Sequence, residues 1–509
     1  MKQILLDGNS LTLSDLIAVG EGNATVGISD EARNWIQKSR DVVDTIVADN
    51  RVVYGVTTGF GNFATVTIPH EKVEELQYNL LRSHAAGIGQ PFPADIARMI
   101  MTLRANVLAK GRSGISLEVL DLLIEMINRN VIPLIPEKGS VGASGDLAPL
   151  AHLGLVLIGE GRARLDDQEG TGAEILKMVG LTPCRLQAKE GLALINGTQV
   201  MTAVGAKALY QAKRLATLAD IAGAMTLEAS KGTATAFDER IHRERPYEGQ
   251  LTCATNMRKL LNDSEIALSH RDCGKVQDSY TLRCIPQVHG PVRETIAFVD
   301  RMLQIEMNSA TDNPMVFAEQ NELVSGGNFH GESVAFWMDY LRIAISELAN
   351  ISERRTERLV NPVLSELPAF LVEEGGLNSG FMLAHVTAAA LVSENKVLAH
   401  PASVDSIPTS ANKEDHVSMG TIAARKTLEV ADNVANVIGI ELLAAAQGLE
   451  FLKPLKPAKA LIPVVKKIRE KIAPWDKDRY MAADLETIRS LMDDGSLVEA
   501  VKSVTGELE

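Results

Sequence analysis

One stretch of the sequence contains residue types that can build an electrophile. Residues 139–152 read GSVGASGDLAPLAH, in which three small residues, Ala143, Ser144 and Gly145, follow one another. Three ordinary interpretations compete: a Gly-rich turn before a helix, a phosphate-binding loop and a nucleophile elbow. The phosphate loop fails because the Walker pattern and its lysine are absent. The elbow fails because Gly-x-Ser-x-Gly would need its second glycine one position after Gly145.

A different chemistry fits the three small residues. Gly145 has no Cβ, so its backbone nitrogen can approach the carbonyl carbon of Ala143 in a tight turn. Ring closure with loss of water gives a five-membered imidazolinone, and Ser144 then loses its hydroxyl to become an exocyclic methylene. The product is a conjugated alkene, an electrophile that no ordinary side chain supplies, and the chain makes it itself.

The run over residues 139–152 resembles the signature of the aromatic amino acid ammonia-lyases, whose prosthetic group is 4-methylidene-imidazole-5-one (MIO). A lone Ala-Ser-Gly is unspecific, but the whole run is very specific, and the resemblance continues from Tyr54 to Met419. It implies that Ala143, Ser144 and Gly145 form MIO autocatalytically. It also implies that the protein needs no metal and no diffusible cofactor.

The segment from Gln277 to Arg283 supplies a second pair of candidates. Tyr280 and Arg283 stand three positions apart, so they share a face if the segment is helical. Arg283 suits a bidentate grip on a substrate carboxylate. The resemblance implies that Tyr280 is the general base for the β-proton, helped by nearby positive charge that lowers its pKa. Taken alone, the segment would be interpreted as a surface Tyr–Arg pair.

Four further residues match positions of the same family. Tyr54 matches a loop tyrosine that meets the substrate amino group, although a core aromatic residue is the plainer interpretation. Asn196 matches an asparagine that helps to form the ring and contacts substrate, and it also suits a helix cap. Gln277 and Phe329 match pocket positions, although a Phe in a Gly-rich turn more often serves packing.

Two positions bear on the choice of substrate. Ser83-His84 resembles the family members that act on histidine, whereas the tyrosine lyases have His-Leu and the phenylalanine lyases Phe-Leu at this pair. Glu414 is the second marker, because a carboxylate accepts a hydrogen bond from an imidazole N–H, which phenylalanine lacks. Lys413 stands where relatives often have Gln, which leaves the tuning of Glu414 open. The resemblance implies elimination of ammonia from L-histidine to give trans-urocanate.

Other functions compete with this one. A tyrosine or phenylalanine ammonia-lyase or a 2,3-aminomutase would share the electrophile, and only product analysis excludes the mutase. A non-catalytic helical scaffold protein is the alternative of another class. It is disfavoured because Tyr54, Asn196, Tyr280 and Arg283 accompany the Ala-Ser-Gly triad. Metal chemistry is disfavoured because HExxH and CxxC patterns are missing.

The elements that carry these residues are expected to be mainly helical. Long apolar stripes with steps of three and four predict helices over residues 198–230, 334–359, 382–400 and 418–451. Several such stripes indicate a bundle, whose apolar faces serve core packing or a subunit interface. We therefore expect a mainly α fold with a long-helix bundle, like the fumarase/aspartase-related lyases. The tail, residues 464–509, is expected to add two or three shorter amphipathic helices.

The N-terminal part of the chain is expected to be mixed. Short segments at residues 4–6 and 51–54 are expected to be strands or loops, and a Gly/Thr-rich loop at 55–62 is expected to be mobile or to cover a ligand. Helices are predicted at 94–111 and 116–130, and a small hairpin within 160–190. The expected domains are a smaller N-terminal domain over residues 1–200, which carries the MIO-forming loop, and the helix-bundle domain over 201–509 with the C-terminal helices.

Composition narrows the partners and the compartment. The net charge of −14 and the lack of a basic patch disfavour nucleic acid. The N-terminal apolar run is too short for a signal peptide, and no segment is long enough to span a bilayer. The four cysteines show no paired spacing and are expected to be reduced, which favours the cytoplasm. The resemblance further implies a homotetramer whose active sites draw on several subunits.

Overall fold

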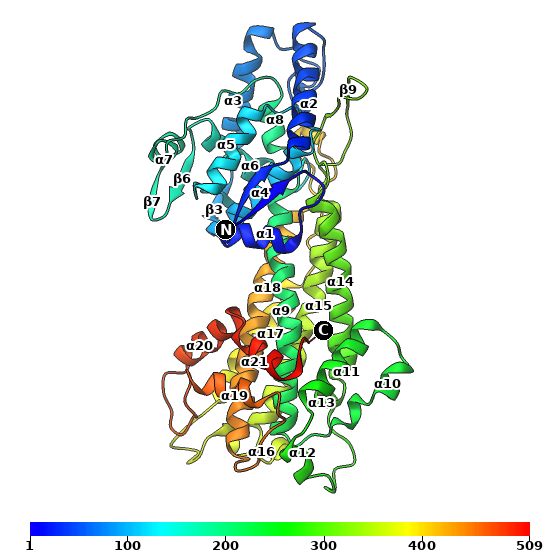
Figure 1. Ribbon diagram of the computed structural model, residues 1–509, viewed down its shortest axis with the longest axis vertical. Helices are drawn as coiled ribbons and strands as arrows, with labels where there is room; N and C mark the ends of the chain where they lie inside the picture. The colour runs from blue at the N-terminus through cyan, green and yellow to red at the C-terminus, as the bar shows by residue number, and fades with distance from the viewer. Residues whose placement is uncertain (509) are drawn as a thin grey trace. The chain divides into compact units, whose positions relative to one another are not determined.

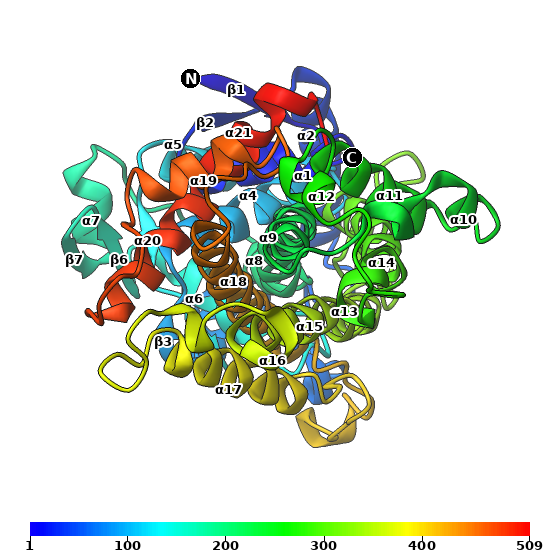
Figure 2. The same cartoon turned by 90° about the horizontal axis from the view of Figure 1, so that it is seen from below.

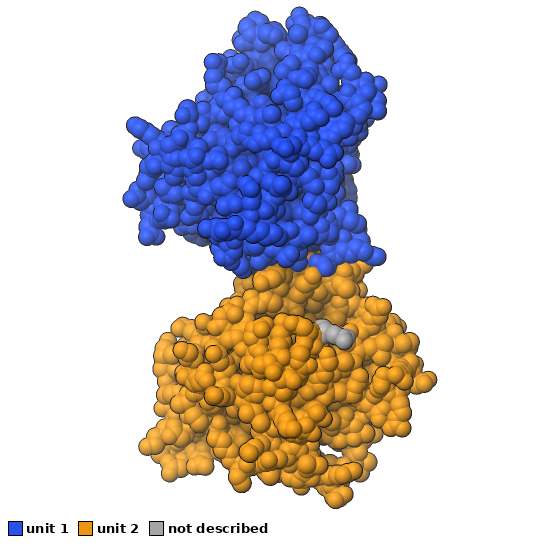
Figure 3. Space-filling view, viewed as in Figure 1, with its two compact units in different colours: residues 1–208, 300–339, 401–425 blue, residues 209–299, 340–400, 426–509 orange. Residues whose placement is uncertain are grey.

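The computed structural model describes residues 1–508 and is mainly α-helical (Figure 1). The chain divides into two compact units, which Figure 3 distinguishes by colour. The first unit comprises residues 1–208, 300–339 and 401–425, and the second comprises residues 209–299, 340–400 and 426–509. The mainly α fold predicted from the sequence is confirmed. The division into domains at residues 1–200 and 201–509 stays a prediction.

The longest helices run close together as a bundle (Figures 1 and 2). They are α9 (Gln199–Ala229), α14 (Ile285–Met307), α15 (Glu332–Val360) and α18 (Gly420–Glu450). Three of them were predicted within two residues of these bounds. The exception is α14, which contains Pro291. A proline inside a helix removes one backbone hydrogen bond, so a reader of the sequence places a break there.

Buried polar contacts join the long helices within the second unit. Arg355 of α15 donates to Glu441 of α18 from Nε at 2.5 Å and from Nη2 at 2.8 Å, and both side chains are fully buried. Thr226 of α9 donates its hydroxyl to the same carboxylate at 2.7 Å. The Glu441 carboxylate therefore contacts side chains from two other long helices.

Shorter helices complete the second unit. They are η3 (Ala234–Phe237), α10 (Glu239–Arg243), α11 (Glu248–Leu260), α12 (Glu265–Ser269), α13 (Tyr280–Arg283), α16 (Pro362–Ser365), η4 (Ala369–Leu371), α17 (Met382–Leu398), α19 (Ile462–Arg469), α20 (Met481–Asp493) and α21 (Ser496–Thr505). The predicted helix at 382–400 is therefore confirmed, and the tail contains three helices as expected.

The first unit is built around shorter buried helices. They are α1 (Leu13–Gly20), α2 (Asp30–Ala48), η1 (Gly61–Phe63), η2 (His70–Lys72), α3 (Val73–His84), α4 (Ala94–Ala109), α5 (Leu117–Asn128), α6 (Leu147–Leu157), α7 (Gly172–Met178), α8 (Glu190–Ile195) and η5 (Ser410–Asn412). Helix α4 is almost entirely buried, and its buried residues include the polar Arg104 and Asn106.

Small sheets lie at the edges of the first unit. Strands β1 (Lys2–Leu6) and β2 (Ala24–Ile28) pair in parallel, with Ile4 opposite Val26. The others are antiparallel: β3 (Ile88–Pro91) with β5 (Pro136–Lys138), β4 (Ile132–Pro133) with β6 (Arg162–Leu165), β6 with β7 (Gln168–Thr171), and β8 (Met315–Phe317) with β9 (Glu322–Val324). The predicted hairpin within 160–190 is formed by β6 and β7.

Of the two segments expected to be strands or loops, residues 4–6 belong to β1 and residues 51–53 form a loop that enters a turn at 54–57. In this turn Val56 and Thr57 donate backbone hydrogen bonds to the carbonyl of Val53. The Thr57 hydroxyl donates to the Arg51 carbonyl and accepts from the Val53 N–H at 2.9 Å. A side chain that forms hydrogen bonds with nearby backbone groups competes with strand pairing for those groups, and here the local hydrogen bonds replace the pairing. Across residues 1–508, no helix is both long and apolar enough to cross a bilayer.

Candidate active site

A cavity of about 810 Å³ in the first unit collects most of the residues that the sequence singled out. The predicted residues on its lining are Tyr54, Ser83, His84, Ser144, Asn196, Phe329 and Glu414. Its apolar lining includes Phe60, Leu76, Leu80, Leu147, Leu192 and Ile195. These residues come from segments that are far apart in the sequence, so their convergence is a finding of the fold.

The Ala143-Ser144-Gly145 turn is held tightly against Gly197. Gly145 has φ +70°, and a Cβ added to it would lie 2.0 Å from the Gly197 carbonyl oxygen. The next residue, Asp146, donates its N–H to the same oxygen at 2.7 Å. Only glycine permits both the positive φ and this approach of two backbones. The Ala143 side chain is buried, so the turn exposes Ser144 to the cavity.

Asp146 joins the turn to the starts of two long helices. Its carboxylate accepts from the backbone N–H groups of Val200 and Met201, each at 2.9 Å, at the beginning of α9. It also accepts from the hydroxyls of Ser140, at 2.9 Å, and Thr421, in the first turn of α18. Burial raises the pKa of Asp146, and these four donors oppose that rise. Helices α6, α9 and α18 all begin near the turn. Because helix N-termini carry partial positive charge, they favour negative charge at the turn.

Ser144 and Glu414 contact each other inside the cavity. Ser144 Oγ donates to Glu414 Oε1 at 2.9 Å, and Thr409 Oγ1 donates to Glu414 Oε2 at 2.6 Å. An antiparallel bridge between Thr409 and Glu414 holds this loop. Lys413, which the sequence left open as a tuning charge, is exposed. Both carboxylate oxygens are therefore positioned, and Oε1 faces the residue that is expected to become the electrophile.

His84 ends α3 with a defined hydrogen-bond pattern. Ser83 Oγ donates to the Leu80 carbonyl at 3.1 Å and lies 3.0 Å from His84 Nδ1. The Ser83 hydroxyl thus lies between the Leu80 carbonyl and the His84 ring. Burial lowers the pKa of His84, which favours the neutral imidazole. A neutral imidazole has one acceptor nitrogen, and this one lies next to a cavity that also contains a carboxylate.

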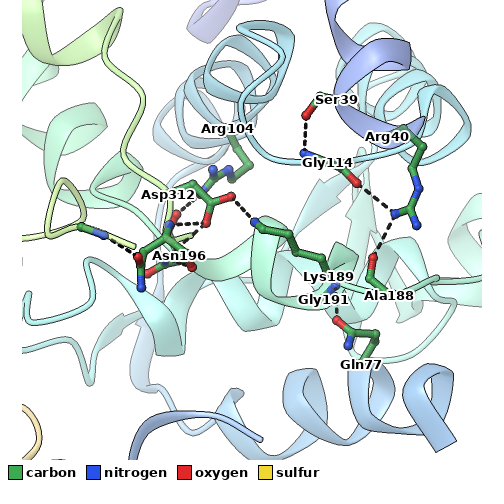
Figure 4. A network of polar contacts seen from close by, with 12 residues as sticks. Ser39, Arg40, Gln77, Arg104, Gly114, Ala188, Lys189, Gly191, Asn196 and Asp312 are labelled. Carbon is green, nitrogen blue, oxygen red and sulfur yellow. Dashed lines mark hydrogen bonds and ion pairs between the residues drawn. The ribbon is translucent and has the colours of Figure 1, made fainter. Parts of the chain in front are cut away.

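Asn196 follows α8 and has both hydrogens of its amide engaged (Figure 4). Its Nδ2 donates to Asp312 Oδ1 and to the Asn313 carbonyl, each at 3.2 Å. These two contacts fix the orientation of the Asn196 amide. Asn196 is buried and lines the cavity, and its amide oxygen is the atom without an assigned donor.

Tyr54 and Phe329 contribute aromatic rings to the lining. The Tyr54 hydroxyl accepts from the Gly61 N–H at 3.4 Å, which links it to the Gly-rich loop 55–62. Four residues of this loop line the cavity, consistent with the predicted ligand-covering position. Phe329 precedes Gly331, whose N–H donates to the Gly142 carbonyl at 3.2 Å beside the Ala-Ser-Gly turn. Backbone contacts thus hold both segments near Ser144.

Gln277, Tyr280 and Arg283 belong to the second unit and do not line this cavity. Tyr280 begins α13 and is 71% exposed. The Arg283 guanidinium lies 4.8 Å from the centre of the Tyr280 ring, and its Nε is buried without a hydrogen-bond partner. The pair is therefore formed as the sequence predicted, on one short helix. Its catalytic role stays a prediction.

Two groups of side chains in residues 1–508 have donor atoms spaced closely enough for a metal ion. Asp220, Cys253 and His289 form one, but Asp220 already accepts from His289 Nδ1 at 2.7 Å and from Arg293 at 2.6 Å. His330, Glu332 and His416 form the other. There His330 Nδ1 accepts from the Glu332 N–H and Nε2 contacts the His416 carbonyl. Hydrogen bonds within the protein therefore engage both groups.

Sequence reasoning missed Asp146 and Asp312 as residues that support the site. Each is a fully buried carboxylate beside a residue of the cavity. The available signal was an acid inside an apolar or Gly-rich stretch, since unpaired buried charges are rare. The apolar lining was also missed, because Leu192 and Ile195 look like ordinary helix core in the sequence.

Comparison with known proteins agrees with this geometry. The model of the aromatic amino acid lyase family matches residues 11–470. A histidine ammonia-lyase of Alkaliphilus oremlandii is 54% identical over 502 residues, which cover 99% of each chain.

Solved structures agree in fold. The crystal structure of histidine ammonia-lyase from Trypanosoma cruzi superposes with a TM-score of 0.92 at 48% identity, covering 99% of this chain and 95% of that one. A tyrosine aminomutase from Streptomyces globisporus has a TM-score of 0.95 at 38% identity, with complete coverage of both chains. The fold is therefore common to enzymes with different products.

Proposed function

The chain belongs to the aromatic amino acid lyase family, and we propose that it eliminates ammonia from L-histidine to give trans-urocanate, the first step of histidine degradation. The observation that carries this proposal is the juxtaposition of His84 and Glu414 in the cavity that contains Ser144. Both offer acceptors suited to an imidazole N–H, and neither suits an unsubstituted phenyl ring. Relatives that bear the name histidine ammonia-lyase support the same choice.

MIO is the proposed cofactor, formed from Ala143, Ser144 and Gly145. The turn fits its formation, because the positive φ of Gly145 and its contact with Gly197 already fold the chain back at this point. When formed, the group supplies an electrophilic methylene that activates the substrate for loss of ammonia. The N-termini of α6, α9 and α18 surround the turn and favour the negative charge that such a group acquires.

The residues of the cavity divide the binding of substrate between them. Glu414 accepts a hydrogen bond from the imidazole N–H of the substrate, and His84 contacts the same ring, whose other surface contacts the apolar lining around Leu192. Asn196 offers its amide oxygen and Tyr54 its hydroxyl to the amino group. Phe329 and the loop 55–62 exclude water from the substrate. Each of these polar groups is held by a protein hydrogen bond, so little reorganisation accompanies binding.

Tyr280 and Arg283 are proposed as the base for the β-proton and the clamp for the carboxylate, with Gln277 beside them. We propose a homotetramer in which each site takes these three residues from a neighbouring subunit. Exposure supports this, since Val276 is 94% and Tyr280 is 71% exposed. Helix α17 likewise exposes apolar Leu383 and Val397, by 58% and 72%. Exposed apolar patches of this kind mark subunit interfaces.

The site is expected to work in the cytoplasm. All four cysteines are free thiols, which suits a reducing compartment. An aminomutase remains the second candidate, because a solved aminomutase has the same fold. The mutase would return the amino group to the substrate, whereas the lyase releases it.

The test is product analysis of the purified protein with L-histidine. Chromatography should identify trans-urocanate and free ammonia in equal amounts, without a β-amino acid. L-tyrosine and L-phenylalanine, assayed in parallel, should react far more slowly. A β-amino acid as main product would establish the mutase, and no reaction with any of the three would overturn the proposal.

A further inference from the structure

Behind Asn196 lies a buried ion pair that no step above uses. Lys189 Nζ donates to Asp312 Oδ2 at 2.8 Å, and both side chains are fully buried (Figure 4). Lys189 immediately precedes α8, and Asn196 immediately follows it. Asp312 therefore contacts the residues at both ends of one short helix, Lys189 through Oδ2 and Asn196 through Oδ1.

The backbone around Lys189 is fixed from several sides. Lys189 has φ +70°, an unfavourable left-handed conformation for a residue with a Cβ. On one side, Arg40 donates to the Ala188 carbonyl at 2.9 Å, and on the other the Gly191 N–H donates to Gln77 Oε1 at 3.0 Å (Figure 4). Such strain persists only where the surroundings impose it. These contacts aim the ammonium group at Asp312.

The pair dictates which way the Asn196 amide faces. Asp312 Oδ1 and the Asn313 carbonyl both contact Nδ2 of Asn196 and are acceptors only. If the amide were turned over, its oxygen would face two other oxygens. Lys189 occupies the other carboxylate oxygen of Asp312, so Oδ1 is left to accept from Asn196.

From this geometry we propose that Lys189 and Asp312 are positioning residues for the reaction, which present the amide oxygen of Asn196 to a substrate N–H. They do not contact the substrate. The inference rests on the proposed function, because it assumes that the substrate has an N–H group that donates to the Asn196 amide oxygen. It predicts that activity depends on an acceptor oxygen at position 312 that faces Asn196, and not on the charges of the Lys189–Asp312 pair.

Two neutral replacements of the pair separate these possibilities. The polar pair is Lys189→Gln with Asp312→Asn. The amide nitrogen introduced at position 312 donates to the Gln side chain, and its amide oxygen still accepts from Asn196. In the apolar pair, Lys189→Met with Asp312→Leu, packing is retained but Asn196 loses its acceptor. Replacing a buried ion pair with apolar residues is often neutral for stability, so the apolar pair should keep a melting temperature near that of the parent.

We expect the polar pair to retain most of the parent kcat/KM for L-histidine. The apolar pair should lose kcat/KM on the order of 100-fold, the cost of a misplaced binding group. The single variant Asp312→Asn should be impaired as well, because one amide oxygen cannot serve both Lys189 and Asn196. In an Asn196→Ala background the apolar pair should add no further loss, because its effect passes through Asn196.

The matched control is a second fully buried ion pair, Arg355 with Glu441, which lies away from Asn196 in the sequence. Arg355→Met with Glu441→Leu should leave KM and kcat close to the parent values. Intact mass, measured for every variant, separates a failure to form MIO from a failure to bind. Turnover by the parent protein tests the proposed function independently. Equal kcat/KM in the polar and apolar pairs, whether high or low, would overturn the inference.

Discussion

Ser144 Oγ donates a hydrogen bond to Glu414 Oε1 at 2.9 Å, although 270 positions separate the two residues in the chain. The residue expected to become the electrophile thus contacts the residue expected to recognise the imidazole ring. The hydrogen bond of Thr409 to the other carboxylate oxygen fixes the orientation. Substrate choice and chemistry are therefore linked through one carboxylate, and the predictions below separate the two.

The first prediction concerns maturation of the Ala143-Ser144-Gly145 turn. Cyclisation removes two waters, so intact-mass spectrometry of the purified chain should show a deficit of about 36 Da. Ser144→Ala should remove the methylene and nearly all activity, with little loss of stability. A protein of full mass that is fully active would show that MIO is not the electrophile.

The second prediction concerns the close approach of Gly145 and Gly197. Gly145→Ala places a Cβ 2.0 Å from the Gly197 carbonyl oxygen at a φ of +70°, so the turn must open. We expect a chain of full mass with activity lost. Gly375→Ala is the matched control, because it meets no atom within 4 Å and has no positive φ. If Gly145→Ala still shows the mass deficit, the contact with Gly197 is not needed for ring closure.

The third prediction concerns specificity. Changing Ser83-His84 to His-Leu or to Phe-Leu, together with Glu414→Gln, should lower turnover of L-histidine far more than that of L-tyrosine or L-phenylalanine. Each unpaired polar group of the imidazole costs about 1–3 kcal/mol. Kinetics on the three amino acids measure the change. An unchanged preference for histidine would mean that the imidazole binds elsewhere.

The fourth prediction concerns pH. Burial lowers the pKa of His84 below its ordinary value of 6.5. Between the lowered pKa of His84 in the folded chain and its ordinary pKa in the unfolded chain, the unfolded chain binds more protons. The free energy of unfolding therefore rises with pH in that window. Above pH 6.5 this contribution is constant. Denaturant unfolding of the parent and of His84→Gln across pH 5–8 should show a smaller slope for the variant below pH 6.5. Equal slopes would contradict a buried neutral His84.

The sequence predicted much of the fold because its signals are local. Periodic apolar stripes without proline marked α9, α15, α17 and α18, and the structure confirms them. Pro291 concealed α14, and at residues 51–54, where the sequence left strand and loop open, hydrogen bonds of the Thr57 and Thr58 hydroxyls favour the loop. Asp312 was not predicted because its importance arises only where Lys189 and Asn196 meet it in space.

The last prediction concerns Tyr280 and Arg283, which belong to the second unit and are not among the residues that line the cavity with Ser144. Tyr280→Phe removes only the phenolic oxygen, so kcat should fall severely while substrate binding is nearly unchanged. Exchange of a β-deuterium label with solvent should almost vanish in Tyr280→Phe. In Arg283→Lys it should persist at a reduced rate, because the planar fork is lost but the base remains. Undiminished exchange in Tyr280→Phe would make Tyr54 the next candidate for the base.

Mixing two inactive variants tests whether neighbouring subunits supply these residues. If each site takes Ser144 from one chain and Tyr280 from another, a random mixture of Ser144→Ala and Tyr280→Phe chains contains intact sites, about a quarter of the total. Subunits exchanged by denaturation and joint refolding should therefore regain activity. The control is the double variant Ser144→Ala with Tyr280→Phe refolded with either single variant, which leaves every site defective. If the first mixture stays as inactive as this control, both residues act within one chain, and the shared-site arrangement is wrong.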